Sequence, residues 1–165
     1  MVYTFFMRQL ILIFMLSTGL ALADPPDNYP FVSYDVGLQQ AQAQHKPIFL
    51  YFGRYGCGFC AKTNKETFSN AALRQLYIDQ YILVYVDSES GERLSLPDGE
   101  RITEAELGAR LNVYATPIFM YLDSTGTVLF RAPGYKTIEE FQAFHRYVSG
   151  GFYKTMSIND FLARK

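Results

Sequence analysis

The stretch that decides the fold is Ile48-Phe49-Leu50-Tyr51-Phe52-Gly53-Arg54-Tyr55-Gly56-Cys57-Gly58-Phe59-Cys60. It begins with an unbroken run of apolar and aromatic residues, a pattern typical of a strand buried on both faces. Gly53 to Gly56 then predict a loop, and we expect Cys57 at the start of the helix that follows. The stretch therefore places a cysteine pair where a buried strand gives way to a helix.

Cys57 and Cys60 are the two cysteines of the chain. A disulfide between them closes a very short loop and removes little entropy from the unfolded chain, so stabilisation is a poor explanation for the pair. The thiolate is the form that attacks disulfides, and the helix dipole favours negative charge on Cys57. Cys60, one turn further on, lies on the same face. We predict a redox-active pair, with Cys57 the nucleophile and Cys60 the resolving thiol.

Half of a metal site is the alternative interpretation of this C-x-x-C pair. A structural zinc ion needs four ligands, and the sequence has no second C-x-x-C. His45 and His145 lie far from the pair in sequence, one before a turn and one on a predicted helix. We interpret both histidines as structural, and we predict no metal and no cofactor besides the redox-active disulfide Cys57–Cys60.

Periodicity and capping signals predict the elements on either side of the cysteine pair. Tyr34 to His45 suits a helix. Ala71 to Asp79 forms a second capped helix, and Tyr81 to Val86 forms a second buried strand. The polar segment Ser88 to Arg101 contains the turn signal Pro97-Asp98-Gly99. We interpret this segment as an insertion that forms a small hairpin.

The second half of the chain carries two further strands and two helices. Thr103 and Glu106 match a capping box that opens a helix. Ile118 to Leu122 and Val128 to Arg131 flank the turn Asp123 to Gly126, which predicts an antiparallel hairpin. A last helix is capped by Thr137, ends at Gly150-Gly151 and has one apolar face formed by Ile138, Phe141, Phe144, Tyr147 and Val148.

This order of elements predicts an α/β sandwich, with a central mixed sheet of about four strands flanked by helices on both faces. The chain has 165 residues, which is the size of one domain. No basic block or arginine-rich stripe is present, and a surface that neutralises several phosphates therefore has no support. We exclude nucleic acid as a partner.

The amino terminus, Met1 to Ala23, has the pattern of a secretory signal peptide. Arg8 precedes the apolar run Leu10 to Leu16, and Ala21-Leu22-Ala23 fits a signal peptidase site. A permanent membrane anchor is the alternative, but the run is shorter than the ~20 residues that a spanning helix prefers. We predict cleavage, a short polar leader, order from about Phe31, and a single domain over residues 24–165 in the periplasm.

The buried aromatic strand, the C-x-x-C that opens a helix, and Thr116-Pro117 before a later strand together resemble thioredoxin. The resemblance spans roughly Val36 to Val148. It implies that Pro117 is cis and faces the cysteines, that the backbone of Thr116 pairs with substrate, and that Gly134 lets substrate approach the same groove. Around the cysteines it places Gly56, Gly58 and Phe59 against the substrate, with the Phe59 ring exposed.

Gly-Cys-Gly-Phe-Cys, the Pro97-Asp98-Gly99 insertion and the tail from Tyr147 to Tyr153 are similar to the SoxW-like branch of exported thioredoxins. This resemblance implies a monomeric disulfide reductase that acts on exported protein disulfides or thiols. It also implies a membrane electron donor of the DsbD type. A thiol oxidase or disulfide isomerase, and a non-catalytic binding module of the same fold, are the alternatives. Both cysteines are intact, which counts against the binding module.

Three positions depart from the thioredoxin pattern. Tyr51 stands where thioredoxin carries a buried acid, Leu83 where it carries a partner lysine, and Gly56 where an aromatic residue precedes the first cysteine. The proton acceptor for Cys60 is therefore open among water, Glu66 and the Tyr51 hydroxyl. On the helix that Cys57 opens, we expect Lys62, Thr63, Lys65 and Glu66 on the exposed side and Ala61 and Phe68 inward.

Overall fold

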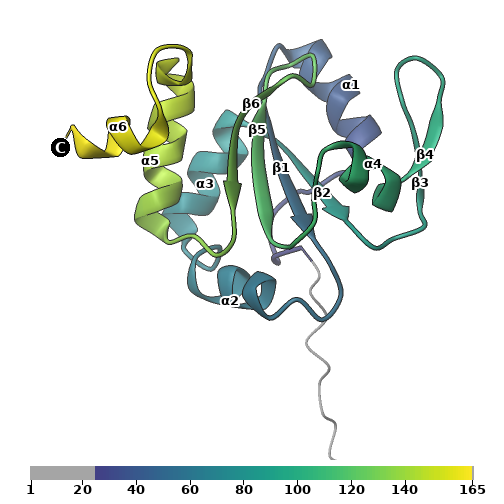
Figure 1. Cartoon of the computed structure of the whole chain (residues 1–165), viewed down its shortest axis with the longest axis horizontal. Coiled ribbons are helices and arrows are strands. Elements are labelled where there is room, and N and C mark those ends of the chain that lie inside the picture. Colours follow the sequence, from purple (N-terminus) through teal and green to yellow (C-terminus); the bar gives the residue numbers. More distant parts are fainter. Residues whose placement is uncertain (1–24, 165) are drawn as a thin grey trace, which may run out of the picture.

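A mixed sheet forms the centre of the computed structural model, which describes residues 25–164 (Figure 1). The sheet has four strands in the order β2-β1-β5-β6. β1 is parallel to β2 and antiparallel to β5, which in turn is antiparallel to β6. The predicted fold class is confirmed. The strands are β1 (Ile48–Gly53), β2 (Ile82–Asp87), β5 (Ile118–Leu122) and β6 (Val128–Pro133).

Helices cover both faces of this sheet, as the sequence predicts (Figure 1). α1 (Tyr34–Gln44) and α4 (Glu104–Arg110) pack on one face, and α3 (Ala71–Gln80) and α5 (Ile138–Ser149) on the other. α2 (Gly58–Glu66) begins at the end of the sheet where β1 ends. The architecture is a three-layer sandwich whose middle layer leads directly into the helix of the cysteine pair.

Alternation along β1 divides the core into two clusters. All of its residues are buried, and successive side chains of a strand point to opposite faces. Phe49 and Tyr51 join the cluster under α3 and α5, which also contains Cys57 and Cys60. The alternate residues Ile48, Leu50 and Phe52 join the cluster under α1 and α4.

The predicted insertion is a two-stranded antiparallel hairpin formed by β3 (Arg93–Ser95) and β4 (Arg101–Thr103). Its central residues, Leu94 and Ile102, are buried in the same cluster as α1 and α4. The hairpin leads straight into the capping box, in which Thr103 and Glu106 exchange side-chain to backbone hydrogen bonds. The insertion is therefore a packed part of the domain.

The segment before α1 differs from the expected leader. Tyr29 is 8% exposed, and its ring packs edge-on against Phe68 with 5.2 Å between ring centroids. Order therefore begins before Phe31, because an aromatic ring in a polar, proline-rich run finds an apolar partner that is distant in sequence. The predicted signal peptide, residues 1–23, lies outside the described residues. Within residues 25–164, no helix has the length and apolar character needed to cross a membrane.

The chain continues past Gly150-Gly151, where the sequence analysis placed the end of the last helix. A 3-10 turn, η1 (Phe152–Lys154), and a further helix, α6 (Ile158–Ala163), follow α5. The Tyr147 hydroxyl donates to the Met156 carbonyl at 2.7 Å and so fastens the turn to α5. The predicted stop is correct for α5, whereas α6 is an additional helix that the sequence does not predict.

Candidate active site

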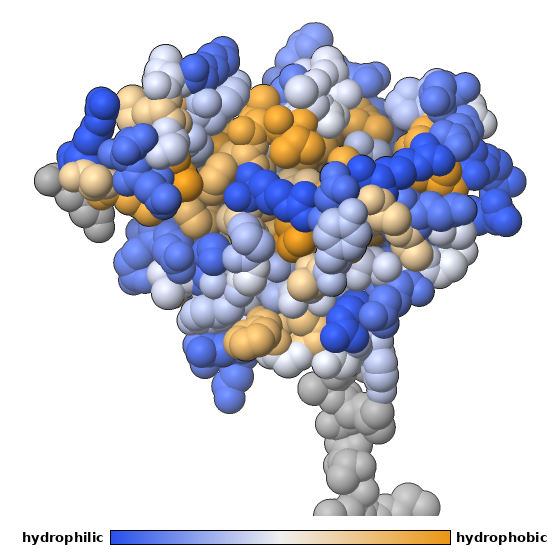
Figure 2. Space-filling view, viewed as in Figure 1, coloured by the Kyte–Doolittle hydropathy of each residue, from blue (hydrophilic) through white to orange (hydrophobic). Residues whose placement is uncertain are grey.

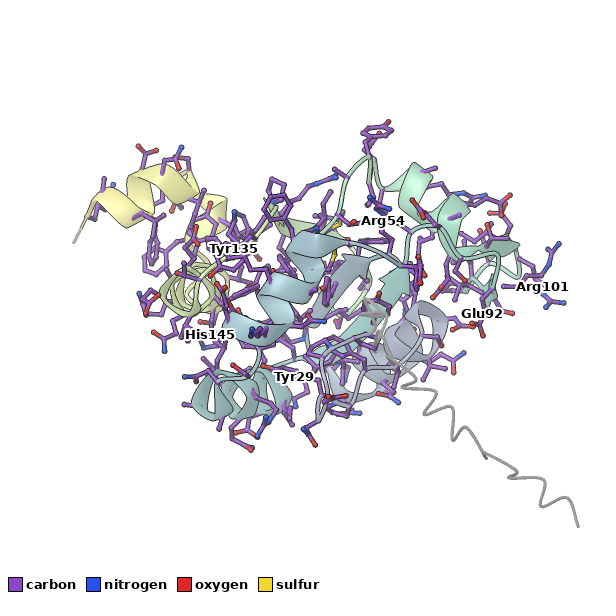
Figure 3. The ribbon with its side chains drawn as sticks, turned by 90° about the horizontal axis from the view of Figure 1, so that it is seen from below. Tyr29, Arg54, Glu92, Arg101, Tyr135 and His145 are labelled. Carbon is purple, nitrogen blue, oxygen red and sulfur yellow. A yellow bond between two sulfur atoms is a disulfide. The ribbon has the colours of Figure 1, made fainter. Side chains whose placement is uncertain are left out.

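Cys57 is the N-cap residue of α2, and its sulfur is bonded to that of Cys60 (Figure 3). Its backbone is extended, whereas the residues after it are helical. The Cys60 N–H donates to the Cys57 Sγ atom at 3.1 Å. A helix start presents unpaired N–H groups, and these stabilise negative charge on a side chain placed there. On reduction, Cys57 therefore has a donor already in position for its thiolate.

The two cysteines differ in access to solvent. Cys57 is 5% exposed and Cys60 is fully buried. Gly56 and Gly58, on either side of Cys57, face open space: an added Cβ atom would meet nothing within 4 Å. A substrate sulfur can therefore approach Cys57, whereas Cys60 is placed to react only within the molecule.

The end of β1, the start of β5 and the end of β6 lie side by side at this end of the sheet. The Thr116–Pro117 peptide bond is cis. The Gly134 N–H donates to the Pro117 carbonyl at 2.8 Å, so these two predicted site residues are neighbours. Gly134 has a φ of +77°, a conformation that favours glycine, and open space lies where a side chain would start. The Thr116 hydroxyl is buried and has no hydrogen-bond partner among the described residues.

The outer side of α2 is tied to the segment that contains Gly134. The Glu66 carboxylate accepts a hydrogen bond from the Tyr135 hydroxyl at 2.9 Å and lies 3.9 Å from the Lys62 ammonium group. The Lys62 nitrogen also lies 4.3 Å from the centre of the Tyr135 ring. Hydrogen bonding to Glu66 raises the pKa of Tyr135. Glu66 thus serves to hold two segments of the site together.

Thr63 is fully buried, which corrects the prediction that it lies on the exposed side of α2. Its hydroxyl donates to the Phe59 carbonyl at 2.8 Å, one turn earlier in the helix. Polarity alone suggested exposure, but a threonine can satisfy its hydroxyl on the backbone of its own helix and bury its methyl group. One turn after Thr63, the Thr67 hydroxyl donates to the Lys136 carbonyl at 2.7 Å.

Tyr51 is buried beneath α2 and donates a hydrogen bond from its hydroxyl to the Asn64 side-chain oxygen at 3.2 Å. Burial raises the pKa of Tyr51 well above its usual range, with a smaller contribution from Tyr85. The phenol therefore stays neutral at physiological pH. Tyr51 provides a hydrogen-bonding hydroxyl at this position and no ionised base.

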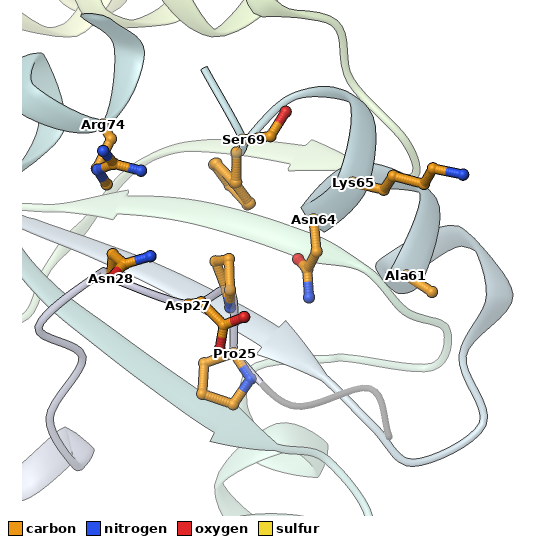
Figure 4. A pocket seen from close by; sticks show the side chains of 10 residues that line it. Pro25, Asp27, Asn28, Ala61, Asn64, Lys65, Ser69 and Arg74 are labelled. Atoms are coloured by element: carbon orange, nitrogen blue, oxygen red, sulfur yellow. The ribbon is translucent and has the colours of Figure 1, made fainter. Parts of the chain in front are cut away.

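A pocket of about 650 Å³ opens behind α2 (Figure 4). One wall comes from α2 and the turn after it, and the other from the segment before α1, with Arg74 of α3 at the end away from α2. Asn64, the partner of Tyr51, lines this pocket, so solvent can reach the buried side of the helix there. The remaining lining residues are Pro25, Pro26, Asp27, Asn28, Ala61, Lys65, Phe68 and Ser69.

Exposed aromatic rings lie next to site residues in the chain. Phe59, between the cysteines, is 64% exposed, and Figure 2 shows an apolar patch over the start of α2. Tyr55 and Tyr114 are also exposed, and they precede Cys57 and Pro117 in the chain. The exposure of Phe59 is predicted from the sequence. Tyr55 and Tyr114 are not, because their sequence signal is limited to a position two or three residues before a site residue.

The two histidines take no part in this site. His145 lies on α5, and its Nδ1 atom is 3.0 Å from the Tyr81 hydroxyl. Burial lowers the pKa of His145, and nearby Arg146 adds to the effect. His45 is the residue that ends α1. Among residues 25–164, no group of three or more His, Cys, Asp or Glu side chains is arranged to hold a metal ion.

Comparisons with known proteins agree with this geometry. Spermatogenesis-associated protein 20 of Mus musculus is 32% identical over 101 residues, which make up 57% of this chain and 12% of that protein. The chain thus spans a small part of this relative. A thioredoxin-fold protein from Helicobacter pylori superposes with a TM-score of 0.62 at 23% identity, over 73% of this chain and 80% of that one. The structure named DsbH oxidoreductase superposes with a TM-score of 0.57 at 20% identity, over 73% of this chain and 84% of that one.

These structural likenesses establish the fold, and a family model establishes the relationship. The model described as a thioredoxin-like domain matches residues 34–149, which contain the sheet, the cysteine pair and Thr116-Pro117. With the Cys57–Cys60 disulfide at the start of α2, the chain belongs to the thioredoxin-like family.

Proposed function

We propose that this protein is a periplasmic thiol-disulfide oxidoreductase that reduces disulfides of exported proteins. The observation that carries the proposal is the position of Cys57, which caps α2 and borders open space while Cys60 is buried behind it. This asymmetry gives one sulfur the role of attacking and the other the role of resolving. The resemblance to the SoxW-like branch supports an exported reductase.

The reaction follows from the two positions. In the reduced protein, the Cys57 thiolate attacks one sulfur of a substrate disulfide, and the other substrate sulfur leaves as a thiolate. Cys60 then loses its proton and attacks the Cys57 sulfur of the mixed disulfide. The substrate sulfur that was bonded to Cys57 leaves as a thiolate, and the Cys57–Cys60 disulfide forms. Two electrons pass from the protein to the substrate, and a membrane dithiol donor of the DsbD type restores the reduced pair.

Water is the proton acceptor that we propose for Cys60. Glu66 is engaged by Tyr135 and Lys62 on the outer side of α2, and Tyr51 is a neutral phenol that donates to Asn64. The pocket behind α2 brings solvent to Asn64 on the buried side of the helix. We therefore propose that water entering from this pocket, and no ionised side chain, takes the proton from Cys60.

The reduction potential of the pair is expected to be nearer that of thioredoxin, about −270 mV, than that of the strong oxidant DsbA, about −120 mV. An oxidant needs strong extra stabilisation of its thiolate, and the dipeptide between the cysteines offers no imidazole. Arg54, the cation on the loop before Cys57, lies 3.4 Å from the Glu89 carboxylate, which offsets its charge.

Equilibration with glutathione buffers, followed by thiol alkylation and mass spectrometry, measures this potential. A value above about −180 mV, that of protein disulfide isomerase, would replace the reductase with an oxidase or isomerase. A pair that exchanges with no disulfide at all would favour the non-catalytic binding module.

The mature protein is expected to begin near Asp24, because Ala21-Leu22-Ala23 follows a short apolar run. Mass spectrometry of the protein from the periplasmic fraction tests this cleavage. Recovery of the chain with Met1 or Arg8 intact in the membrane fraction would show that the segment anchors the protein instead.

A further inference from the structure

The loop between α4 and β5, residues 111–117, is held in place by Arg131 of β6. The Arg131 guanidinium donates to the Leu111 carbonyl at 2.7 Å and to the Asn112 carbonyl. The last carbonyls of a helix lack partners within the helix and carry the negative end of its dipole, so a cation is favourable there. Arg131 therefore fixes the end of α4 from the neighbouring strand.

Arg131 lies on the correct face of the sheet for this contact. It pairs with Met120 across β5 and β6, and residues directly opposite each other in a sheet share a face. Met120 is buried in the cluster that α4 covers. The side chain of Arg131 thus runs under the loop that leads to Pro117.

Asn112 transmits this restraint to Tyr114. Asn112 has a φ of +56°, and its N–H donates to the Ala109 carbonyl at 3.0 Å. Its side-chain oxygen accepts a hydrogen bond from the Tyr114 hydroxyl at 3.0 Å. The Tyr114 ring is 84% exposed, yet its polar end is held. An exposed ring fixed in this way loses less conformational entropy when a partner packs against it.

Tyr114 stands at the end of the sheet that carries the disulfide. Phe52 and Ile118 are paired in β1 and β5, so the loop after β1 and the loop before β5 leave the sheet side by side (Figure 1). Within residues 25–164, six large apolar side chains are exposed, and three of them, Tyr55, Phe59 and Tyr114, belong to these loops or to the start of α2.

Two pairs of opposite charges lie at this end of the molecule. Arg54 lies 3.4 Å from Glu89, and Lys62 lies 3.9 Å from Glu66. A partner that brings apolar side chains therefore gains more here than a highly charged one. Rings from two separate segments, one around Cys57 and one before Pro117, suit a polypeptide better than a small disulfide, because residues on both sides of a polypeptide disulfide can reach them.

We propose that Tyr114, positioned by Asn112 and Arg131, is a specificity-determining residue that contacts an apolar side chain next to the disulfide of an extended polypeptide client. The inference rests on the proposed reductase function and names its substrate class. Arg131 acts through the loop and is a positioning residue.

The test compares reduced wild type with Tyr114→Ala in single-turnover reactions with three disulfides. Two are synthetic peptides with the disulfide flanked by phenylalanine or by serine, and the third is oxidised glutathione. An aromatic contact at an interface contributes on the order of a tenfold change, so Tyr114→Ala is expected to slow the phenylalanine peptide about tenfold. The other two reactions are expected to change less than about twofold, because they lack the apolar contact.

Arg131→Lys keeps the charge but loses the guanidinium group that donates to two carbonyls. This variant is expected to lower the preference for the phenylalanine peptide over the serine peptide about threefold, with unchanged rates for the serine peptide and oxidised glutathione. Val128→Ala, an exposed apolar residue at the far end of β6, and Arg101→Gln, an exposed arginine of β4, are the matched controls. Equal slowing of all three disulfides by Tyr114→Ala, or no slowing, would overturn the inference. A wild type that reduces none of them would instead overturn the proposed function.

Discussion

Cys57→Ser is expected to abolish disulfide reduction, because it removes the sulfur that the helix start activates and that open space exposes. Loss of a covalent nucleophile lowers the rate by a factor on the order of a thousand or more. Insulin turbidity with dithiothreitol as reductant, corrected for the uncatalysed reaction, measures the loss. A variant with appreciable residual activity would show that Cys57 is not the nucleophile.

Cys60→Ser is expected to behave differently, since the first step remains possible and the resolving step does not. The variant should accumulate mixed disulfides with clients, visible as adducts on non-reducing gels. The double variant Cys57→Ser with Cys60→Ser is the control, and it should form none. Alkylation at neutral pH is expected to modify Cys57 first in the reduced protein. Preferential modification of Cys60 would reverse the two roles.

Local signals made the central part of the site predictable. The aromatic run of β1, the loop and the helix start lie within one short stretch, so the place of Cys57 follows from the residues beside it. The capping boxes at Thr103 and Thr137 are equally local, and both are present in the structure. The mixed sheet of about four strands follows from the alternation of such elements, whereas the strand order β2-β1-β5-β6 is seen only in the structure.

The sequence does not predict which side chains contact each other, above all when the residues are far apart in the chain. Tyr29 lies in a proline-rich polar run, and only the position of Phe68 shows why its ring is buried. Tyr114 donates to Asn112, whose carbonyl accepts from Arg131 of β6, a residue distant in sequence. Thr63 was misassigned because polarity does not reveal whether a hydroxyl finds a carbonyl one turn away.

Phe49→Ala is expected to lower the free energy of unfolding by about 3–5 kcal/mol, the usual cost of deleting a buried phenylalanine ring. Phe49 is fully buried in β1. Its ring stacks on Phe119 with 5.9 Å between centroids and meets Tyr77 edge-on at 4.8 Å. A cavity among rigid rings cannot collapse easily. Since a domain has about 5–15 kcal/mol of stability in total, the variant loses a large share of it.

Urea unfolding of the oxidised protein measures this cost, with Phe59→Ala as the control. The same substitution at a ring that is 64% exposed is expected to change the stability by no more than about 0.5 kcal/mol. Phe49→Leu, which fills most of the space, should cost less than about 1.5 kcal/mol and keeps the test valid if the alanine variant does not fold. Equal costs for Phe49→Ala and Phe59→Ala would contradict the assignment of Phe49 to the core. Cys57 and Cys60 belong to the same buried cluster as Phe49, so the test probes the core on which the start of α2 rests.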